Sequence, residues 1–154
     1  MEYIESAHDE QDQGCVFCGL LEDAEEAATR VLDRTGLAFV ALAKYPYNPG
    51  HLLVLPVRHV DELEAMTEDE HLEVARLLQR SIRALREAAD PHGFNVGLNL
   101  GRAAGAGIPE HLHWHVVPRW GGDTNFMPVV GQTRVLPELL DETFAKLRPR
   151  FAGG

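Results

Sequence analysis

Positive charge and long apolar runs are both scarce in this sequence. Its 154 residues include 14 Lys and Arg against 24 Asp and Glu, which gives a net charge of −10 with histidine neutral. A field of that sign repels a polyphosphate backbone, and no cluster of Lys or Arg offsets it, so the composition argues against nucleic-acid binding. The apolar runs are too short to span a membrane, and residues 1–14 lack the apolar core of a secretory signal. We therefore expect a cytoplasmic protein with no membrane partner, in which any phosphate ligand is a small molecule held by a local pocket.

Cysteine is scarce as well. The chain has two cysteines, Cys15 and Cys18, separated by two residues. In a chain for which we expect no export, this spacing is more typical of a metal-binding or redox pair than of a structural disulfide.

The order of apolar and polar segments predicts one α+β domain. Residues 1–13 are acidic and polar, and we expect them to form a flexible arm before a single domain over residues 14–154. Thr67 and Glu70 form a capping-box pattern, and the apolar periodicity that follows predicts a long helix ending near Asp90. A shorter C-terminal helix is predicted at 136–147. Runs of strand length lie at 37–43, 51–57, 94–100 and 111–117, and we expect them to pair as an antiparallel meander around the long helix.

The last of these strands carries alternating histidines. Because successive side chains of a strand point to opposite faces, His111, His113 and His115 should share one face, beside a glycine-rich loop at 101–107. A neutral imidazole can act as a nucleophile, a general base or a metal ligand. A solvated polar face and a strand that binds metal through all three histidines are the alternatives.

These residues resemble the motif of the histidine triad (HIT) family, in which histidines alternate with apolar residues. Two further segments fit: Asn48 to Pro56 is similar to the family's Pro-Gly-His strand, and Asn99 to Gly101 with Ala104 and Gly105 resembles its phosphate-binding loop. The resemblance implies a HIT-like fold, with a five-stranded antiparallel meander, one long helix and a C-terminal helix. Arg119 to Pro128 resembles the branch that includes actinobacterial diadenosine tetraphosphate phosphorylases.

The resemblance also implies roles for individual residues. His113 corresponds to the nucleophile that forms a covalent AMP-histidine intermediate, with His111, His115 and His51 as its catalytic companions. The residues implied to contact the nucleotide are Asn99, Gly105, Ala106, Gly107, Ala43, Lys44 and Trp120. Two positions depart from the family pattern: Ala43 stands where several members have a ribose-binding Asn, and the loop at 104–110 is one residue longer and lacks a phosphate-binding Gln.

A second group of residues resembles the structural zinc site of many bacterial members. Its ligands would be Cys15, Cys18, His59 and His111, a Cys₂His₂ set of the kind that zinc prefers. The resemblance implies no organic cofactor and a homodimer or higher homo-oligomer. The expected reaction is cleavage of dinucleoside polyphosphates, with inorganic phosphate favoured over water as acceptor. An adenosine phosphoramidase, a non-catalytic zinc-containing module that binds adenine nucleotides, and a plain metal carrier remain as alternatives.

Overall fold

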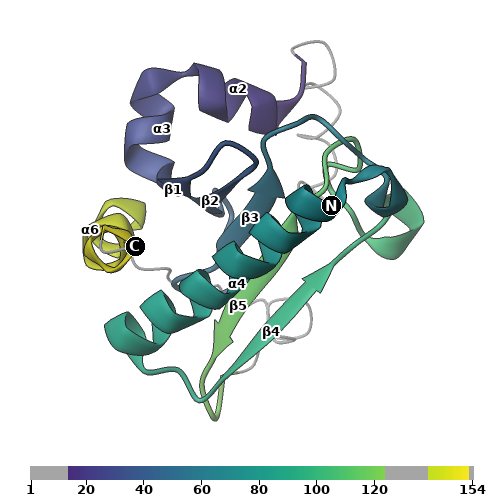
Figure 1. The fold of residues 1–154 in the computed structure, drawn as a ribbon. Coiled ribbons are helices and arrows are strands. Elements are labelled where there is room, and N and C mark those ends of the chain that lie inside the picture. The colour runs from purple at the N-terminus through teal and green to yellow at the C-terminus, as the bar shows by residue number, and fades with distance from the viewer. Residues whose placement is uncertain (1–13, 124–138, 153–154) are drawn as a thin grey trace.

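A five-stranded antiparallel sheet with the order β1-β2-β3-β5-β4 forms the centre of the structure, a computed structural model that describes residues 14–123 and 139–152 (Figure 1). The predicted arm at 1–13 lies outside the described residues. The strands are β1 (Val31–Arg34), β2 (Ala38–Leu42), β3 (Leu52–Pro56), β4 (Gly93–Leu98) and β5 (Trp114–Arg119). The helices are α2 (Val16–Glu22), α3 (Ala24–Arg30), α4 (Glu68–Ala89) and α6 (Leu140–Phe151), with short 3₁₀ turns at Leu63–Ala65 and Arg102–Ala104.

The α+β class and the five antiparallel strands are confirmed, but a simple meander is wrong. β5 lies between β3 and β4 instead of at the edge of the sheet. The chain leaves β3 through the 22-residue helix α4, which runs across the sheet, and returns as β4 at the outer position. The β4–β5 hairpin then places β5 in the remaining gap, where it pairs with both neighbours.

Most element boundaries lie within a few residues of those predicted. The short edge strand β1 was not predicted, because Asp33 and Arg34 break the apolar pattern. β5 begins at Trp114 rather than at 111, because the preceding segment leaves the sheet and the Leu112 amide donates to the Val60 carbonyl at 2.8 Å. The C-terminal helix begins at Leu140 and ends four residues beyond the predicted end; 136–138 lie outside the described residues.

Helix α4 begins at the predicted capping box. The Thr67 hydroxyl accepts from the Glu70 amide at 3.1 Å, and the Glu70 carboxylate accepts from the Thr67 amide at 2.8 Å. Arg58 donates to the same carboxylate at 2.8 Å and, with the cap, lowers the pKa of Glu70 to about 2. This ion pair fixes the chain just before His59 to the start of α4. Among the described helices, none is long and apolar enough to cross a membrane.

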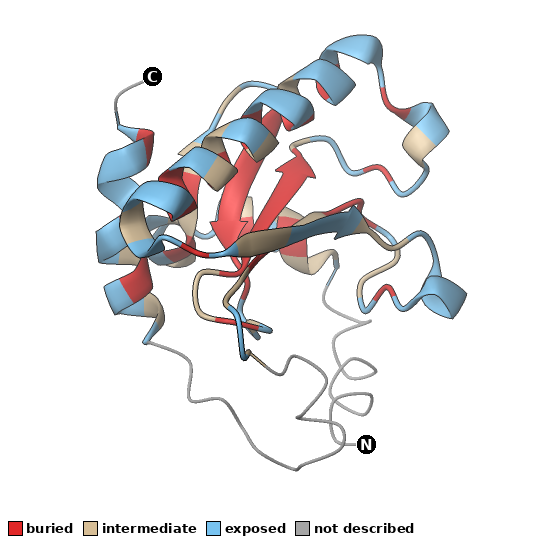
Figure 2. Ribbon diagram, turned by 90° about the horizontal axis from the view of Figure 1, so that it is seen from below, coloured by how far each residue is buried: buried red, intermediate tan, exposed pale blue. Residues whose placement is uncertain are grey.

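The sheet is buried on both faces at β2 and β3 (Figure 2). Even-numbered residues such as Val40 and Val54 pack into a core with α4 and α6. Odd-numbered residues such as Phe39 and Leu53 pack into a second core with Phe17 of α2. The sheet therefore separates a large core on the α4 side from a smaller one on the α2 side, and strand alternation decides which side each residue faces.

Candidate active site and metal centre

An open cleft of about 730 Å³, including its mouth, lies on the α2 side of the sheet. The walls come from the start of α2, the end of α3, the β2–β3 turn, the loop before β5 and three histidines. The lining residues are Val16, Phe17, Arg30, Ala43, Lys44, Tyr45, Tyr47, His51, Leu53, Gly105, Gly107, Ile108, His113 and His115.

Strand alternation brings the histidines to this side, as the sequence predicted. Leu112 and Val116 lie in the core on the α4 side, so the odd-numbered residues between and beside them face α2. His115 is paired with Leu53 across β3 and β5. His113 is 6% exposed although it precedes the strand, which shows that the extended backbone keeps its alternation before the ladder begins.

The turn that carries His51 is held closely against the sheet. Gly50 has a φ of 85°, and a Cβ atom there would lie 3.0 Å from a methyl carbon of Leu85, so a side chain would be both strained and crowded. The buried Asn48 amide donates to the Pro118 carbonyl at 3.0 Å and to the Asp123 carboxylate at 2.9 Å. His51 is therefore fixed relative to the end of β5.

Hydrogen bonds determine the tautomers of His51 and His115. The Tyr47 backbone N–H donates to His51 Nδ1 at 3.1 Å, so this nitrogen must be an acceptor. In a neutral ring the proton is then on His51 Nε2, which lies 2.9 Å from His115 Nδ1 and donates to it. His115 consequently carries its own proton on Nε2. The chain of hydrogen bonds leaves one N–H of His115 available to a ligand.

His113 has the opposite arrangement. Its Nδ1 lies 2.8 Å from the His111 carbonyl oxygen, which can only accept, so Nδ1 carries the proton. The remaining nitrogen, Nε2, then has a free lone pair. The rings of His113 and His115 are 5.0 Å apart between centroids. The cleft thus combines a potential nucleophile with a neighbouring hydrogen-bond donor.

Burial keeps these imidazoles neutral. Desolvation, followed by the proximity of His115 and His113, lowers the pKa of His51 to about 3. Desolvation and the proximity of His113 lower the pKa of His115 to about 4. The pKa of His113 is also lowered by burial, although its bond to the His111 carbonyl and the charge of Glu110 act against the shift. At neutral pH the tautomers described above are the expected states.

The buried His51 should make stability depend on pH. As the pH falls below its ordinary pKa of 6.5, the unfolded chain binds a proton that the folded chain refuses down to about pH 3, so stability is lost across that window. The loss amounts to about 1.4 kcal/mol for each pH unit below the ordinary pKa. Between about pH 7.5 and 5.5, urea unfolding should show the wild type losing about 1.4 kcal/mol more than His51→Gln. Equal losses in the two proteins would contradict a neutral His51.

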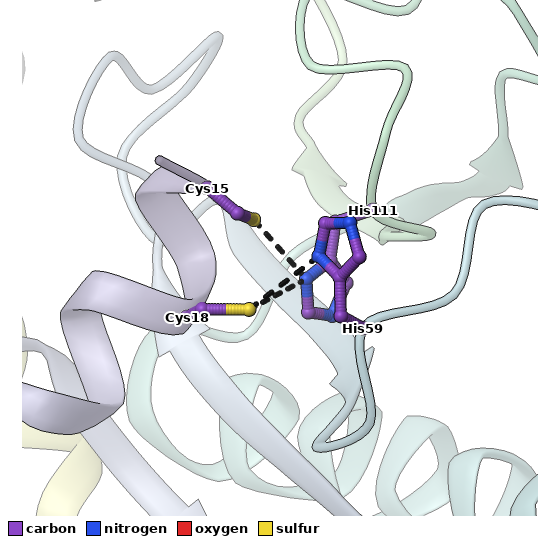
Figure 3. A group of neighbouring side chains, drawn as sticks. All are labelled: Cys15, Cys18, His59 and His111. Atoms are coloured by element: carbon purple, nitrogen blue, oxygen red, sulfur yellow. Dashed lines mark hydrogen bonds between the residues drawn. The ribbon is translucent and has the colours of Figure 1, made fainter. Parts of the chain in front are cut away.

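A cluster of two thiols and two imidazoles lies beside the cleft (Figure 3). The ligand atoms of Cys15, Cys18, His59 and His111 all lie within 4.8 Å of one another. Figure 3 shows both thiols pointing from the start of α2 toward the two rings. Cys15 Sγ is 3.3 Å from His111 Nδ1, and Cys18 Sγ is 3.5 Å from His59 Nδ1 and 3.7 Å from His111 Nδ1. The four predicted metal ligands therefore come together from three separate segments of the chain.

These separations fit a tetrahedral metal site. With a Zn–S bond of about 2.3 Å and a Zn–N bond of about 2.1 Å, sulfur and nitrogen ligands lie about 3.6 Å apart. His111 Nε2 lies 2.9 Å from the Pro56 carbonyl and donates to it, which leaves Nδ1 unprotonated toward the thiols. Burial and the neighbouring Cys15 raise the pKa of the Cys18 thiol to about 11. The four residues therefore fit a Cys₂His₂ ligand set for one metal ion.

The predicted nucleotide residues divide into two groups. Four of them line the cleft: Ala43, Lys44, Gly105 and Gly107. Among the described residues, Asn99, Ala106 and Trp120 lie outside its walls. The Asn99 amide nitrogen lies 3.7 Å from the position that a Cβ atom would take at Gly105. The Trp120 backbone N–H donates to the Asp123 carboxylate at 3.1 Å. A contact between these three residues and a nucleotide stays a prediction.

Several residues of the cleft were not predicted. Phe17 lies between the two cysteines, and Tyr47 lies in the turn before His51, so both had a signal in the sequence. The Tyr47 ring stacks on His115 at 5.7 Å between centroids. Arg30 had no such signal: its guanidinium donates to the Leu42 carbonyl at 3.0 Å, a contact that depends on the tertiary fold.

Comparison with known proteins places these observations among relatives. A family model described as the HIT domain matches residues 24–122. A Mycobacterium tuberculosis protein named AP-4-A phosphorylase is 50% identical over 122 residues, which make up 79% of this chain and 63% of that protein. The chain thus spans less than two thirds of the length of this relative. An uncharacterized HIT-like protein from Methanocaldococcus jannaschii is 31% identical over 71% of this chain and 81% of its own length.

A solved structure shows the same fold. It is described as a Zn-bound histidine triad family protein from Mycobacterium smegmatis, and it matches with a TM-score of 0.73 at 28% identity. The match covers 90% of this chain and 94% of that one.

Proposed function

The chain belongs to the HIT domain family, and from that premise we propose that it cleaves dinucleoside polyphosphates by nucleotidyl transfer through His113. Diadenosine tetraphosphate is the favoured substrate, because the 50% identical relative is named AP-4-A phosphorylase. The observation that carries the proposal is the pair of fixed tautomers in the cleft. They give His113 a free Nε2 lone pair and His115 a free N–H.

The first step is attack on the α-phosphorus. His113 Nε2 forms a P–N bond, and the bond from that phosphorus to the bridging oxygen of the leaving ATP breaks. The N–H of His115 donates toward the phosphate oxygens, where negative charge develops. The His111 carbonyl holds the proton on His113 Nδ1 and stabilises the ring as it becomes positively charged.

The second step regenerates the histidine. An oxygen of inorganic phosphate attacks the same phosphorus, the P–N bond breaks, and ADP leaves. With water as the acceptor, the product is AMP instead. The amides of the 105–107 loop are further candidates for holding the α-phosphate, since Gly105 and Gly107 line the cleft.

The metal site has a structural part in this proposal. We infer that zinc is the ion, because two thiolates and two imidazoles suit it and the Mycobacterium smegmatis relative is described as Zn-bound. A bound ion would tie the start of α2 to His111 and the segment before β5. We also expect a single HIT domain over residues 14–154 with a C-terminal extension, a cytoplasmic location and a homodimer.

One incubation distinguishes the reactions. Diadenosine tetraphosphate is supplied with and without inorganic phosphate, and the nucleotide products are separated. If ADP and ATP form only when phosphate is added, the reaction is phosphorolysis. If AMP and ATP form without phosphate, the reaction is hydrolysis. Cleavage of adenosine phosphoramidate with no action on the dinucleotide would contradict the substrate. Failure to cleave either compound would favour a module that binds nucleotides without turnover.

A further inference from the structure

The segment from Cys15 to Cys18 faces two sites at once. Its outer residues supply the two thiols of the metal cluster. Its inner residues, Val16 and Phe17, line the cleft. The same turn of chain therefore belongs to the metal centre and to the wall of the proposed nucleotide site.

Phe17 connects the two sites physically. Its side chain is 4% exposed, and its ring lies 5.0 Å between centroids from His113, at an angle of 50°. It also meets the edge of the His111 ring at 5.7 Å. Phe17 thus contacts a metal ligand and a cleft histidine with one ring, and it packs with Leu53 in the core on the α2 side.

Side-chain packing and the thiol–imidazole contacts fix the position of this turn. Helix α2 has seven residues, and its N-cap Cys15 makes no side-chain capping bond. A helix of this length is not stable alone, so its placement depends on packing and on cross-links to the rest of the domain. Packing comes from Phe17 and Leu20, while a metal ion would supply cross-links to His59 and His111.

We propose that metal binding at Cys15, Cys18, His59 and His111 sets the affinity of the cleft for adenine nucleotides, with Phe17 as the positioning residue. With the metal bound, Phe17 is held against His113 and closes one wall of the cleft. Without it, the start of α2 is free to move away and the wall opens. The inference rests on the proposed function in one respect, namely that the cleft binds a nucleotide.

Coupling of this kind is reciprocal. If zinc tightens AMP binding by some factor, AMP must tighten zinc binding by the same factor. The expected factor is roughly 5- to 150-fold, the usual range for coupled sites. Both affinities are measurable on the full chain without any turnover.

The test uses AMP and zinc as probes. AMP is titrated into zinc-loaded and chelator-treated protein by calorimetry, and zinc affinity is measured against a competing chelator with and without AMP. We expect AMP to bind more tightly to the zinc-loaded form and to tighten zinc by the same factor. Equal AMP affinity with and without zinc would overturn the coupling while leaving the proposed function intact. Absence of AMP binding to either form would overturn both.

Variants of α2 decide whether Phe17 carries the coupling. Phe17→Ala should still bind zinc, but AMP should no longer tighten that binding. Phe17→Leu should restore part of the effect, and Leu21→Ala, on the same helix but outside the walls of the cleft among the described residues, should retain it. The AMP affinity of each zinc-loaded variant is measured in parallel, and this comparison does not require the metal-free chain to fold. A Phe17→Ala protein whose zinc affinity still responds fully to AMP would overturn the assignment.

Discussion

Replacing His113 with alanine should lower kcat for diadenosine tetraphosphate by about a thousandfold or more, because the proposed nucleophile has no substitute in the cleft. His115 cannot take over, since its free position carries a proton and its other nitrogen accepts from His51. Binding of the nucleotide should survive, because the apolar walls and the loop around Gly105 are unchanged. The defect is therefore expected in kcat more than in affinity.

The intermediate itself provides the sharper measurement. Wild-type protein is mixed with substrate in the absence of phosphate, and the reaction is quenched after a short time. The protein mass is then measured by mass spectrometry to detect the addition of one AMP group. His113→Ala should show no adduct. His71→Ala is the matched control, because His71 is exposed on α4, and it should form the adduct normally. An adduct on the His113→Ala protein would contradict the proposed nucleophile.

Loss of a metal ligand should be the largest effect on stability. Consider an ion that binds the folded chain but not the unfolded chain. At a free concentration of about a thousand times its Kd, it stabilises the folded chain by roughly 4 kcal/mol. For a domain of this size that corresponds to a fall in Tm of about 10 °C when the site is lost. We expect this fall for Cys18→Ser and for wild type treated with a chelator, and the two effects should not add.

The control for the metal comes from the triad. His115→Ala changes a cleft histidine that lies outside the metal cluster, so its zinc content per chain, measured by atomic emission, should equal that of the wild type. Cys18→Ser should retain little zinc. Loss of zinc from His115→Ala would instead favour a metal carrier that uses all three triad histidines.

Local patterns predicted much of the architecture. Alternation gave the common face of the histidines, and the capping box at Thr67 marked the start of α4, because both depend on residues a few positions apart. The metal cluster could also be predicted, because the chain has few thiols and imidazoles and their chemistry as ligands is specific. The resemblance to the family assigned His59 and His111 as partners of the two cysteines. Their separation along the chain does not reveal that they lie together.

Features that depend on distant contacts were missed. Arg30 reaches the cleft because the carbonyl of Leu42 fixes its guanidinium, and no pattern near residue 30 announces this. The position of β5 between β3 and β4 follows from the path of α4 across the sheet, which apolar periodicity does not encode. Phe17 was missed for a different reason: its place between the two cysteines is a local signal for the metal cluster, and its second role as a wall of the cleft depends on the fold.

The ladder between β3 and β5 limits how this chain can change in length. It pairs Leu52 with Val116, Leu53 with His115 and Val54 with Trp114, so the partner of each residue sets the side to which it points. Inserting one residue between His113 and His115 would turn one of these histidines into the core on the α4 side and bring an apolar neighbour into the cleft. Inserting two residues would return both histidines to the same side of the sheet but would increase the distance between them. A protein engineer should therefore leave the segment from 111 to 116 at its present length.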